Sequence, residues 1–287
     1  MPEIKPIGAN PLQKYFRQVK VHIDLPSKGK YYPDGVLDMP ETGELPVYAM
    51  TAKDELTMKT PDALLNGAAT VELIKSCVPN IKDPWQMPSI DIDAILIAIR
   101  IASYGENLEI TTKIPNVGTE KDFQIDLRQV LNKLTNVEFV DTFEVDNMMV
   151  HIKPLSYKEF TDSAMKTFEE QRVFRLVNDE TIPEQEKLAR FNESFLKLTN
   201  LTVGMMSKSV KGITVDGETV DNPLHIQEFI DNADKKFFTT VMEHLEGEKK
   251  KFTIEPFKVT STDEEIAQGA PKTYEVPITF DQSNFFG

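Results

Sequence analysis

The sequence predicts an α+β fold in which small antiparallel sheets are packed with a central helical region. Three observations support this prediction. Short β-like apolar runs bounded by turn residues occupy both ends of the chain, apolar residues recur at helical spacing between residues 156 and 206, and strands and helices do not alternate regularly. A doubly wound nucleotide-binding fold needs that alternation, so the sequence argues against it.

The first half of the chain begins with a proline-rich segment. Residues 1–35 have few periodic apolar positions, so we expect an extended N-terminal arm. Residues 36–50 are typical of two short strands around a Pro/Gly turn. Helical periodicity and capping residues then predict helices that begin at Thr51 with Asp54 as its capping partner, cover 62–78, and cover 90–103 after Ser89 as the cap.

The second half mixes hairpins with longer helices. The sequence predicts hairpins at 108–127 and 139–155, followed by a helix after the capping box at 156–159 and a helix with Pro183 near its first turn. After these it predicts a hairpin that turns at Asp216–Gly217, helices in 222–248, and strands at 250–259 and 272–287. The predicted divisions are an extended arm (1–35), an α+β domain with a ribbon-like hairpin (36–155), a mainly helical region (156–248), and a C-terminal β hairpin and tail completing the ribbon (249–287).

Bulk composition excludes several classes of function. The formal net charge is −14 and the pI about 4.8, whereas binding to nucleic acid or an anionic membrane needs clustered Lys and Arg. We therefore expect neither partner. The single cysteine, Cys77, allows no intramolecular disulfide, and the start lacks the apolar stretch of a signal peptide. These features favour a chain made in a reducing cytoplasm.

Motifs for catalysis or for a cofactor are missing from the sequence. No phosphate loop, dinucleotide fingerprint or nucleophile elbow occurs, and the four histidines lie far apart. The acidic pairs Asp91/Asp93 and Glu264/Glu265 are interpreted as a helix start and a solvated turn. Cys77, among apolar helical positions, is expected to be buried and inert. We predict a protein that is not an enzyme and has no cofactor or metal.

Two segments are candidates for partner binding. The turn-rich stretch LPSKGKYY combines lysines and tyrosines, and tyrosine is common at interfaces. A local turn folded onto the body is the alternative. Near the C-terminus, a pair of phenylalanines is either tucked into the domain or docked on a neighbour. The candidate residues are Leu25, Pro26, Lys28, Gly29, Lys30, Tyr31, Tyr32, Phe285 and Phe286.

The hairpin at 108–127 has the frame of a zinc knuckle without its ligands. Its turn reads KIPNVG, where small metal-binding ribbons carry Cys-Pro-x-Cys-Gly. Ile114 and Val117 stand at the two thiol positions, and apolar side chains cannot bind zinc. The fold class is therefore predicted to include a degenerate, zinc-ribbon-like hairpin.

Several motifs in order resemble the baseplate hub subunit family of T4-like contractile-tail bacteriophages. The motifs are LPSKGKYY, the DEL…LLNGAATVELIKSCV block, RIASYG, IPNVG followed by FQIDL, and a C-terminal strand closing on FF. Relatives are often shorter, with the extra residues here placed around 156–248, so nothing is carried over to that region.

This resemblance implies a structural or assembly component of the phage tail baseplate that acts by protein–protein docking. The partners implied are other hub proteins and the tape-measure protein, with wedge proteins as a further option, in a multi-copy assembly. The implied location is the virion tail baseplate, after synthesis in the host cytoplasm. The alternative is a tail assembly chaperone that is absent from the mature virion. A baseplate-borne hydrolase is the weakest alternative, because no paired-carboxylate or metal motif supports it.

Relatives in this family look as if they hold a CPxCG knuckle where this chain has IPNVG. Ile254 and Phe257 in the tail offer a second pair of positions at the same spacing. We hypothesise that the two hairpins pair and that Ile114, Val117, Ile254 and Phe257 form an apolar cluster in place of the metal. The alternative is that the two hairpins are unrelated and merely apolar.

Overall fold

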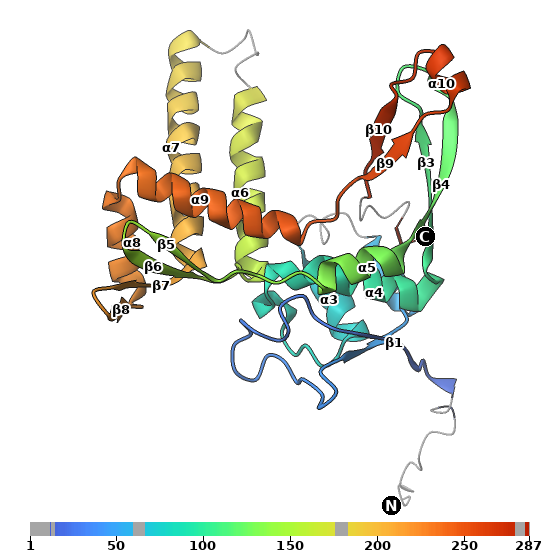
Figure 1. Cartoon of the computed structure of the whole chain (residues 1–287), viewed down its shortest axis with the longest axis horizontal. Helices are drawn as coiled ribbons and strands as arrows, with labels where there is room; N and C mark the ends of the chain where they lie inside the picture. The colour runs from blue at the N-terminus through green and yellow to red at the C-terminus, as the bar shows by residue number, and fades with distance from the viewer. Residues whose placement is uncertain (1–11, 13–14, 60–66, 176–182, 279–284, 287) are drawn as a thin grey trace, which may run out of the picture.

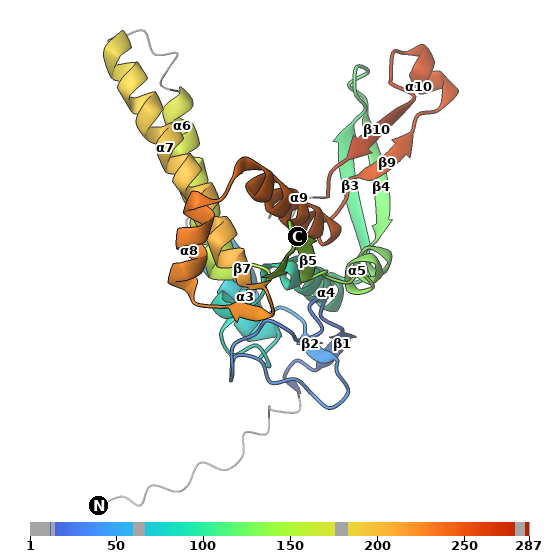
Figure 2. The same cartoon turned by 60° about the vertical axis from the view of Figure 1, so that its left-hand side comes forward.

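The computed structural model describes residues 12, 15–59, 67–175, 183–278 and 285–286. It confirms a mixed fold of helices and small antiparallel sheets, with one four-stranded sheet and three two-stranded sheets among these residues. A body at the base carries two projections, which Figures 1 and 2 show side by side above it. We call them the β arm and the helical arm.

The body packs around one very apolar helix. Its elements are β1 (Val19–Ile23), β2 (Leu45–Tyr48), α1 (Ala52–Met58), α3 (Ala68–Cys77), η2 (Pro84–Gln86), η3 (Ser89–Asp91), α4 (Ile92–Tyr104) and α5 (Leu127–Thr135). Helix α4 is apolar on nearly all sides, which is typical of a helix at the centre of a core. It ends at Gly105, whose φ of 89° suits glycine and whose N–H donates to Ile101 O (3.0 Å).

Helix starts in the body confirm one prediction and correct another. Thr51 and Asp54 form the predicted capping box of α1. Ser89 does not cap α4: it begins the 3-10 turn η3, and its N–H donates to Leu155 O (2.8 Å). Because η3 intervenes, α4 begins at Ile92 and Asp91 is turned into the body.

The β arm consists of two hairpins. Its elements are β3 (Asn107–Lys113), β4 (Glu120–Asp126), β9 (Phe257–Thr260), α10 (Asp263–Ala267) and β10 (Thr273–Val276). Strand β3 pairs with β4 and β9 with β10, both antiparallel (Figure 1). The hairpins touch through Lys121 and Glu265 (2.7 Å) and through Asn116 and Gly269 O (3.4 Å). Hairpins far apart in sequence thus lie together.

A second core lies beside the body. The strands β5 (Thr142–Val145), β6 (Met148–Ile152), β7 (Val210–Val215) and β8 (Glu218–Val220) form the four-stranded sheet, and α8 (Pro223–Asn232) and α9 (Lys235–Lys251) accompany it. The predicted boundary at residue 155 falls within the sequence span of this sheet. Helix α9 also corrects a prediction, because residues 250 and 251 end the helix instead of starting a strand. Lysines are favourable at a helix C-terminus.

The segment 136–141 joins the two cores and is held on both sides. On one side, Val140 N donates to Glu248 Oε2 (2.8 Å) and His244 donates to Val140 O (3.0 Å). On the other, Tyr31 OH donates to Asp141 Oδ2 (2.9 Å). We call this segment the strap.

The helical arm consists of α6 (Tyr157–Arg175), which begins on the body, and α7 (Glu184–Ser209), which ends at the second core (Figure 2). The capping box predicted at 156–159 is present: Ser156 N donates to Glu159 Oε2 (2.9 Å), and Glu159 N donates to Ser156 Oγ (3.2 Å). The two helices are joined where Ser194, which is buried, donates to Glu170 Oε2 (2.7 Å).

Candidate protein–protein interface

The LPSKG segment is folded into the body around one buried carboxylate. Asp91 Oδ1 accepts from Ser27 N (2.7 Å), and Oδ2 accepts from Ser27 Oγ (2.6 Å) and Tyr32 OH (2.9 Å). Burial raises the pKa of Asp91 to about 6, although these three donors oppose the shift. Burial also raises the pKa of Tyr32, with the Asp91 charge adding to it. Asp91 stands at a helix start, as the sequence interpretation had it, and it is fully buried there.

The turn after Ser27 depends on left-handed backbone. Lys28, Gly29 and Tyr31 have φ values of 54°, 74° and 69°. A Cβ on Gly29 would come within 2.8 Å of Met39 Cε, so glycine fits here for both conformation and space. This turn fixes the direction in which the neighbouring side chains leave the body.

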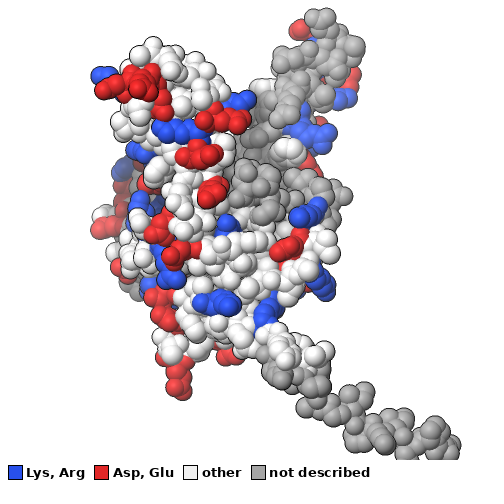
Figure 3. All heavy atoms as spheres, turned by 90° about the vertical axis from the view of Figure 1, so that its right-hand side faces the viewer, with Lys and Arg blue, Asp and Glu red and all other residues white. Residues whose placement is uncertain are grey.

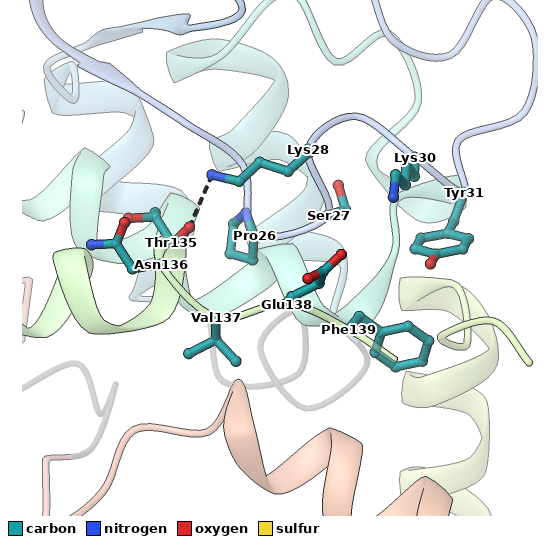
Figure 4. Close-up of a pocket in the computed structure, with 10 residues that line it drawn as sticks. All are labelled: Pro26, Ser27, Lys28, Lys30, Tyr31, Thr135, Asn136, Val137, Glu138 and Phe139. Carbon is teal, nitrogen blue, oxygen red and sulfur yellow. Dashed lines mark hydrogen bonds between the residues drawn. The ribbon is translucent and has the colours of Figure 1, made fainter. Parts of the chain in front are cut away.

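A surface hollow of about 290 Å³ lies between this turn and residues 135–139 (Figure 4). Lys28 Nζ reaches over it to Thr135 O (2.9 Å), and Tyr31 packs edge-on against Phe139 with ring centroids 5.6 Å apart. Lys28 and Lys30 are exposed and Tyr31 is half-buried. These three side chains are the part of the predicted contact segment that a neighbour can reach.

The other members of that segment face the chain's own interior. Leu25 is 1% exposed, Pro26 is buried, and Tyr32 is held on Asp91. Strand β1 is paired with β2, so residues 19–35 are not an extended arm. This is the alternative of a turn folded onto the body, and the residue that holds it, Asp91, lies 64 residues from Ser27 and 59 from Tyr32. Residues 1–11 and 13–14 lie outside the described residues.

The C-terminal phenylalanines are also inside. Phe285 and Phe286 are 0% and 5% exposed, belong to the body's apolar core, and contact each other edge-on with centroids 4.9 Å apart. Of the two alternatives for this pair, the structure has the tucked arrangement. Positions 279–284 and 287 lie outside the described residues.

The four degenerate-knuckle positions are distributed along the β arm. Ile114 is 4% exposed and forms the turn of the first hairpin, where its carbonyl accepts from Val117 N (3.2 Å). Ile254 and Phe257 precede the second hairpin's turn, at 261–272, and line a hollow with Ile125 near the base of the arm. The hairpins pair as hypothesised, but the two knuckle pairs lie at different heights of the arm and do not converge on one point.

Within the described ranges, no group of three or more His, Cys, Asp or Glu side chains is placed to hold a metal ion. Cys77 is fully buried, and burial followed by the nearby Asp54 charge raises the pKa of its thiol to about 12. That thiol is a poor nucleophile at neutral pH.

The helical arm exposes large apolar side chains. They are Met165 (37%), Phe168 (53%), Leu188 (61%), Phe191 (38%), Phe195 (58%) and Leu196 (61%). They are exposed because α6 and α7 cover only one side of each other, and the further helix that contacts α7 is α8. A detectable signal was present: Leu188, Phe191 and Phe195 recur at helical spacing, and charged residues lie between them.

This arm also borders an apolar groove of about 470 Å³ at its base. Helix α9 closes one side of it. The lining includes Phe160, Phe168, Met205, Met206, Met242 and Leu245. An apolar groove continuous with exposed apolar helix surface is typical of a protein-binding site.

Charged groups are distributed differently. On the face shown in Figure 3, basic and acidic side chains are intermingled, so the described part of this face has no large basic patch. Among the described helices, none is long and apolar enough to cross a membrane.

Comparison with known proteins gives one match. The model of a family described as T4 bacteriophage base plate protein matches residues 17–268, from just before β1 to just after α10. No curated protein and no solved structure matches the chain.

Proposed function

The chain belongs to the T4 bacteriophage base plate protein family, and from this premise we propose that it is a structural subunit of the baseplate hub that works by docking. Membership makes it a T4-like phage baseplate protein. The hub position, the docking mechanism and the absence of catalysis are the proposal. Its partners on this reading are other hub proteins and the tape-measure protein, in the virion tail.

The observation that carries the docking proposal is the uncovered apolar surface of the helical arm. Phe168 and Phe195 are more than half exposed on helices that project from the rest of the molecule (Figure 1). Contiguous apolar surface of this kind is unfavourable in water and marks interaction sites. A projecting arm can reach a neighbouring subunit, whereas a catalytic site needs a cleft with convergent polar groups.

The hollow between Lys30 and Glu138 is the second proposed contact. It offers the exposed ammonium groups of Lys28 and Lys30 beside the half-buried ring of Tyr31 (Figure 4). In a chain of net charge −14, an exposed pair of lysines at a shaped hollow favours an acidic segment of a neighbouring protein.

Mass spectrometry of purified particles, with copy-number quantification, tests the proposal. A fixed small copy number that co-purifies with baseplate substructures after particle disruption is the expected result. Absence from mature particles, together with a complex between this chain and one tail protein in infected cells, would instead establish the assembly chaperone.

A charge-reversed variant tests the proposed contact at the hollow between Lys30 and Glu138. Lys30→Glu is expected to lower incorporation into particles, because it places a carboxylate in a hollow proposed to receive an acidic segment. Lys53→Glu, at an exposed position on α1 in the body, is the matched control and should leave incorporation unchanged. Equal incorporation of both variants would remove this hollow from the docking surfaces.

A further inference from the structure

We propose that the partner of the helical arm's apolar face is a second copy of this chain, bound antiparallel across a two-fold axis. This inference rests on the docking function proposed above and names the occupant of one of its surfaces. Four observations carry it: the segregation of charge on the arm, the continuity of its apolar face, the groove at its base, and the size of the surface.

Charge is segregated on α7. Ser194 marks the side that faces α6, because it donates to Glu170. At about 100° per residue, Leu188, Phe195 and Met206 all lie about 100 to 120° to one side of it. Arg190, Glu193 and Lys197 lie about 40 to 100° to the other side, whereas Glu184, in the first turn, lies about 80° to the apolar side.

Helix α6 repeats this division. Measured from Glu170, its groove-lining residues Phe160, Thr167 and Gln171 lie about 60 to 100° to one side, and Asp162 and Glu169 lie about 80 to 100° to the other. Residues of both helices line the same groove, so the uncharged sides of α6 and α7 form one face.

Ion pairs occupy the opposite side of the arm. Arg190 pairs with Glu186 (2.6 Å), and Lys197 pairs with Glu193 (2.8 Å) and Glu170 (3.6 Å). These charges already have partners within the chain. In a two-fold contact, residue i of one copy meets residue j of the other, so the apolar residues of this face would meet the same face and the groove, whose lining also includes Lys153, Glu246 and Lys249.

The face and the groove form one surface with a projection at one end and a recess at the other. From Met206 at the groove to Leu188 near the tip, α7 spans about 27 Å. An antiparallel pairing places the tip of each arm against the groove of the other. Methionines line that groove, and their flexible side chains adapt to an incoming apolar group.

The surface is large enough for a dimer. A face about 27 Å long and two helix widths, about 20 Å, across has roughly 500 Å² in projection, and two such faces give about 1,000 Å² or more. Two paired helices on each copy would complete a four-helix bundle, in which the uncovered sides of both hairpins become the core.

Sedimentation of the full chain tests the pairing. The wild-type protein should be a reversible dimer at micromolar concentration. Phe195→Asp should raise the dissociation constant by about 30-fold or more, because it buries a carboxylate at the centre of the contact. Leu196→Asp is the matched control: Leu196 is as exposed as Phe195 but lies on the side of α7 away from both α6 and the apolar face, so the dimer should persist.

Cysteine cross-linking tests the antiparallel register. In a Leu188→Cys, Met242→Cys double variant the two thiols belong to opposite ends of the face, so oxidation should give a covalent dimer on a non-reducing gel. Either single variant should give none in this register, and the buried Cys77 does not interfere.

A wild-type monomer at tens of micromolar, or dissociation by Leu196→Asp but not by Phe195→Asp, would overturn the inference. Particle composition distinguishes this failure from failure of the hub proposal. A monomer that is still present at fixed copy number in particles refutes only the second-copy partner, whereas absence from particles refutes the hub position.

Discussion

The two arms rise from the same molecule but handle their apolar side chains in opposite ways. In the β arm, Phe123 contacts Phe257 and Tyr274, each with ring centroids 6.4 Å apart, and Val259 is 7% exposed. In the helical arm, Phe195 is 58% exposed. The β arm packs these aromatic rings against each other, whereas the helical arm exposes its phenylalanine to solvent.

The difference follows from the geometry of the elements. Side chains of a strand alternate between two faces, so two hairpins that lie face to face can bury one apolar side each and leave polar residues outside. Two helices meet along a single line of contact, and an apolar stripe wider than that line stays uncovered. The β arm therefore covers most of its large apolar side chains, with Phe257 (42% exposed) as an exception, whereas the helical arm leaves several of them uncovered.

The largest effect should come from the body beneath both arms. Asp91→Ala leaves Ser27 N–H, Ser27 OH and Tyr32 OH without their acceptor, and we expect a loss of about 3 kcal/mol in the free energy of unfolding. Urea denaturation measures it. The loss should be shared by both arms in hydrogen exchange, and protection lost in one arm alone would show that the arms do not depend on this base.

Phe123→Ala should break the β arm. Its ring is partly buried between the two hairpins, so removing it should cost about 2 kcal/mol, less than for a fully buried phenylalanine. Phe195→Ala is the counterpart in the helical arm and should change monomer stability by no more than about 0.5 kcal/mol. Thermal unfolding in dilute solution compares them, and equal losses would contradict the contrast between the arms.

Ser194→Ala should loosen the helical arm without opening the β arm. It removes a partly buried hydrogen bond to the Glu170 carboxylate, and the expected cost is about 1 to 2 kcal/mol. Hydrogen exchange should increase along α6 and α7 only. Thr199→Ala, on the exposed surface of α7, is the control. Unchanged exchange in Ser194→Ala would mean that the two helices are held by apolar contacts alone.

The smallest effect concerns the ion pair that joins the two β hairpins. Hydrogen bonding with Lys121 lowers the pKa of Glu265 below its ordinary 4.5. A lowered acid pKa stabilises the fold at neutral pH, and the contribution is lost as the pH falls below 4.5 through the lowered value. In acid, the backbone amides of α10 in the wild type should lose their protection from hydrogen exchange. In Glu265→Gln this protection should be missing at every pH. A parallel acid profile in the two proteins would show that the pair does not connect the hairpins.

Local patterns in the sequence were sufficient for much of the fold. The capping boxes at Thr51 and Ser156, the hairpin turns, and the helices of the arm all follow from a few neighbouring residues. The turn at Asp146–Asn147, with φ of 46° and 67°, is a further example. These features depend on short-range physics, which a sequence window contains.

The features that could not be predicted depend on long-range contacts. Asp91 stands at a helix start, as interpreted, but its burial depends on the approach of Ser27, 64 residues away. The short helix α10 is a different case: it was missed although Thr262 and Glu265, three residues apart, form a capping box that the sequence contains. The exposure of Phe195 depends on which elements pack against α7. Helical periodicity predicts an apolar side of the helix but does not show whether another element covers that side.

The strap has a mechanical consequence. Because Tyr31 holds it from the N-terminal side and Glu248 and His244 hold it from α9, three segments distant in sequence converge on one short stretch of backbone. Helix α6 is also joined to the body directly, because Tyr157 N donates to Met87 O (2.7 Å) and the Tyr157 ring stacks on Trp85. A force on the helical arm would therefore load both connections. Torque applied at its tip would turn the body and the β arm with it.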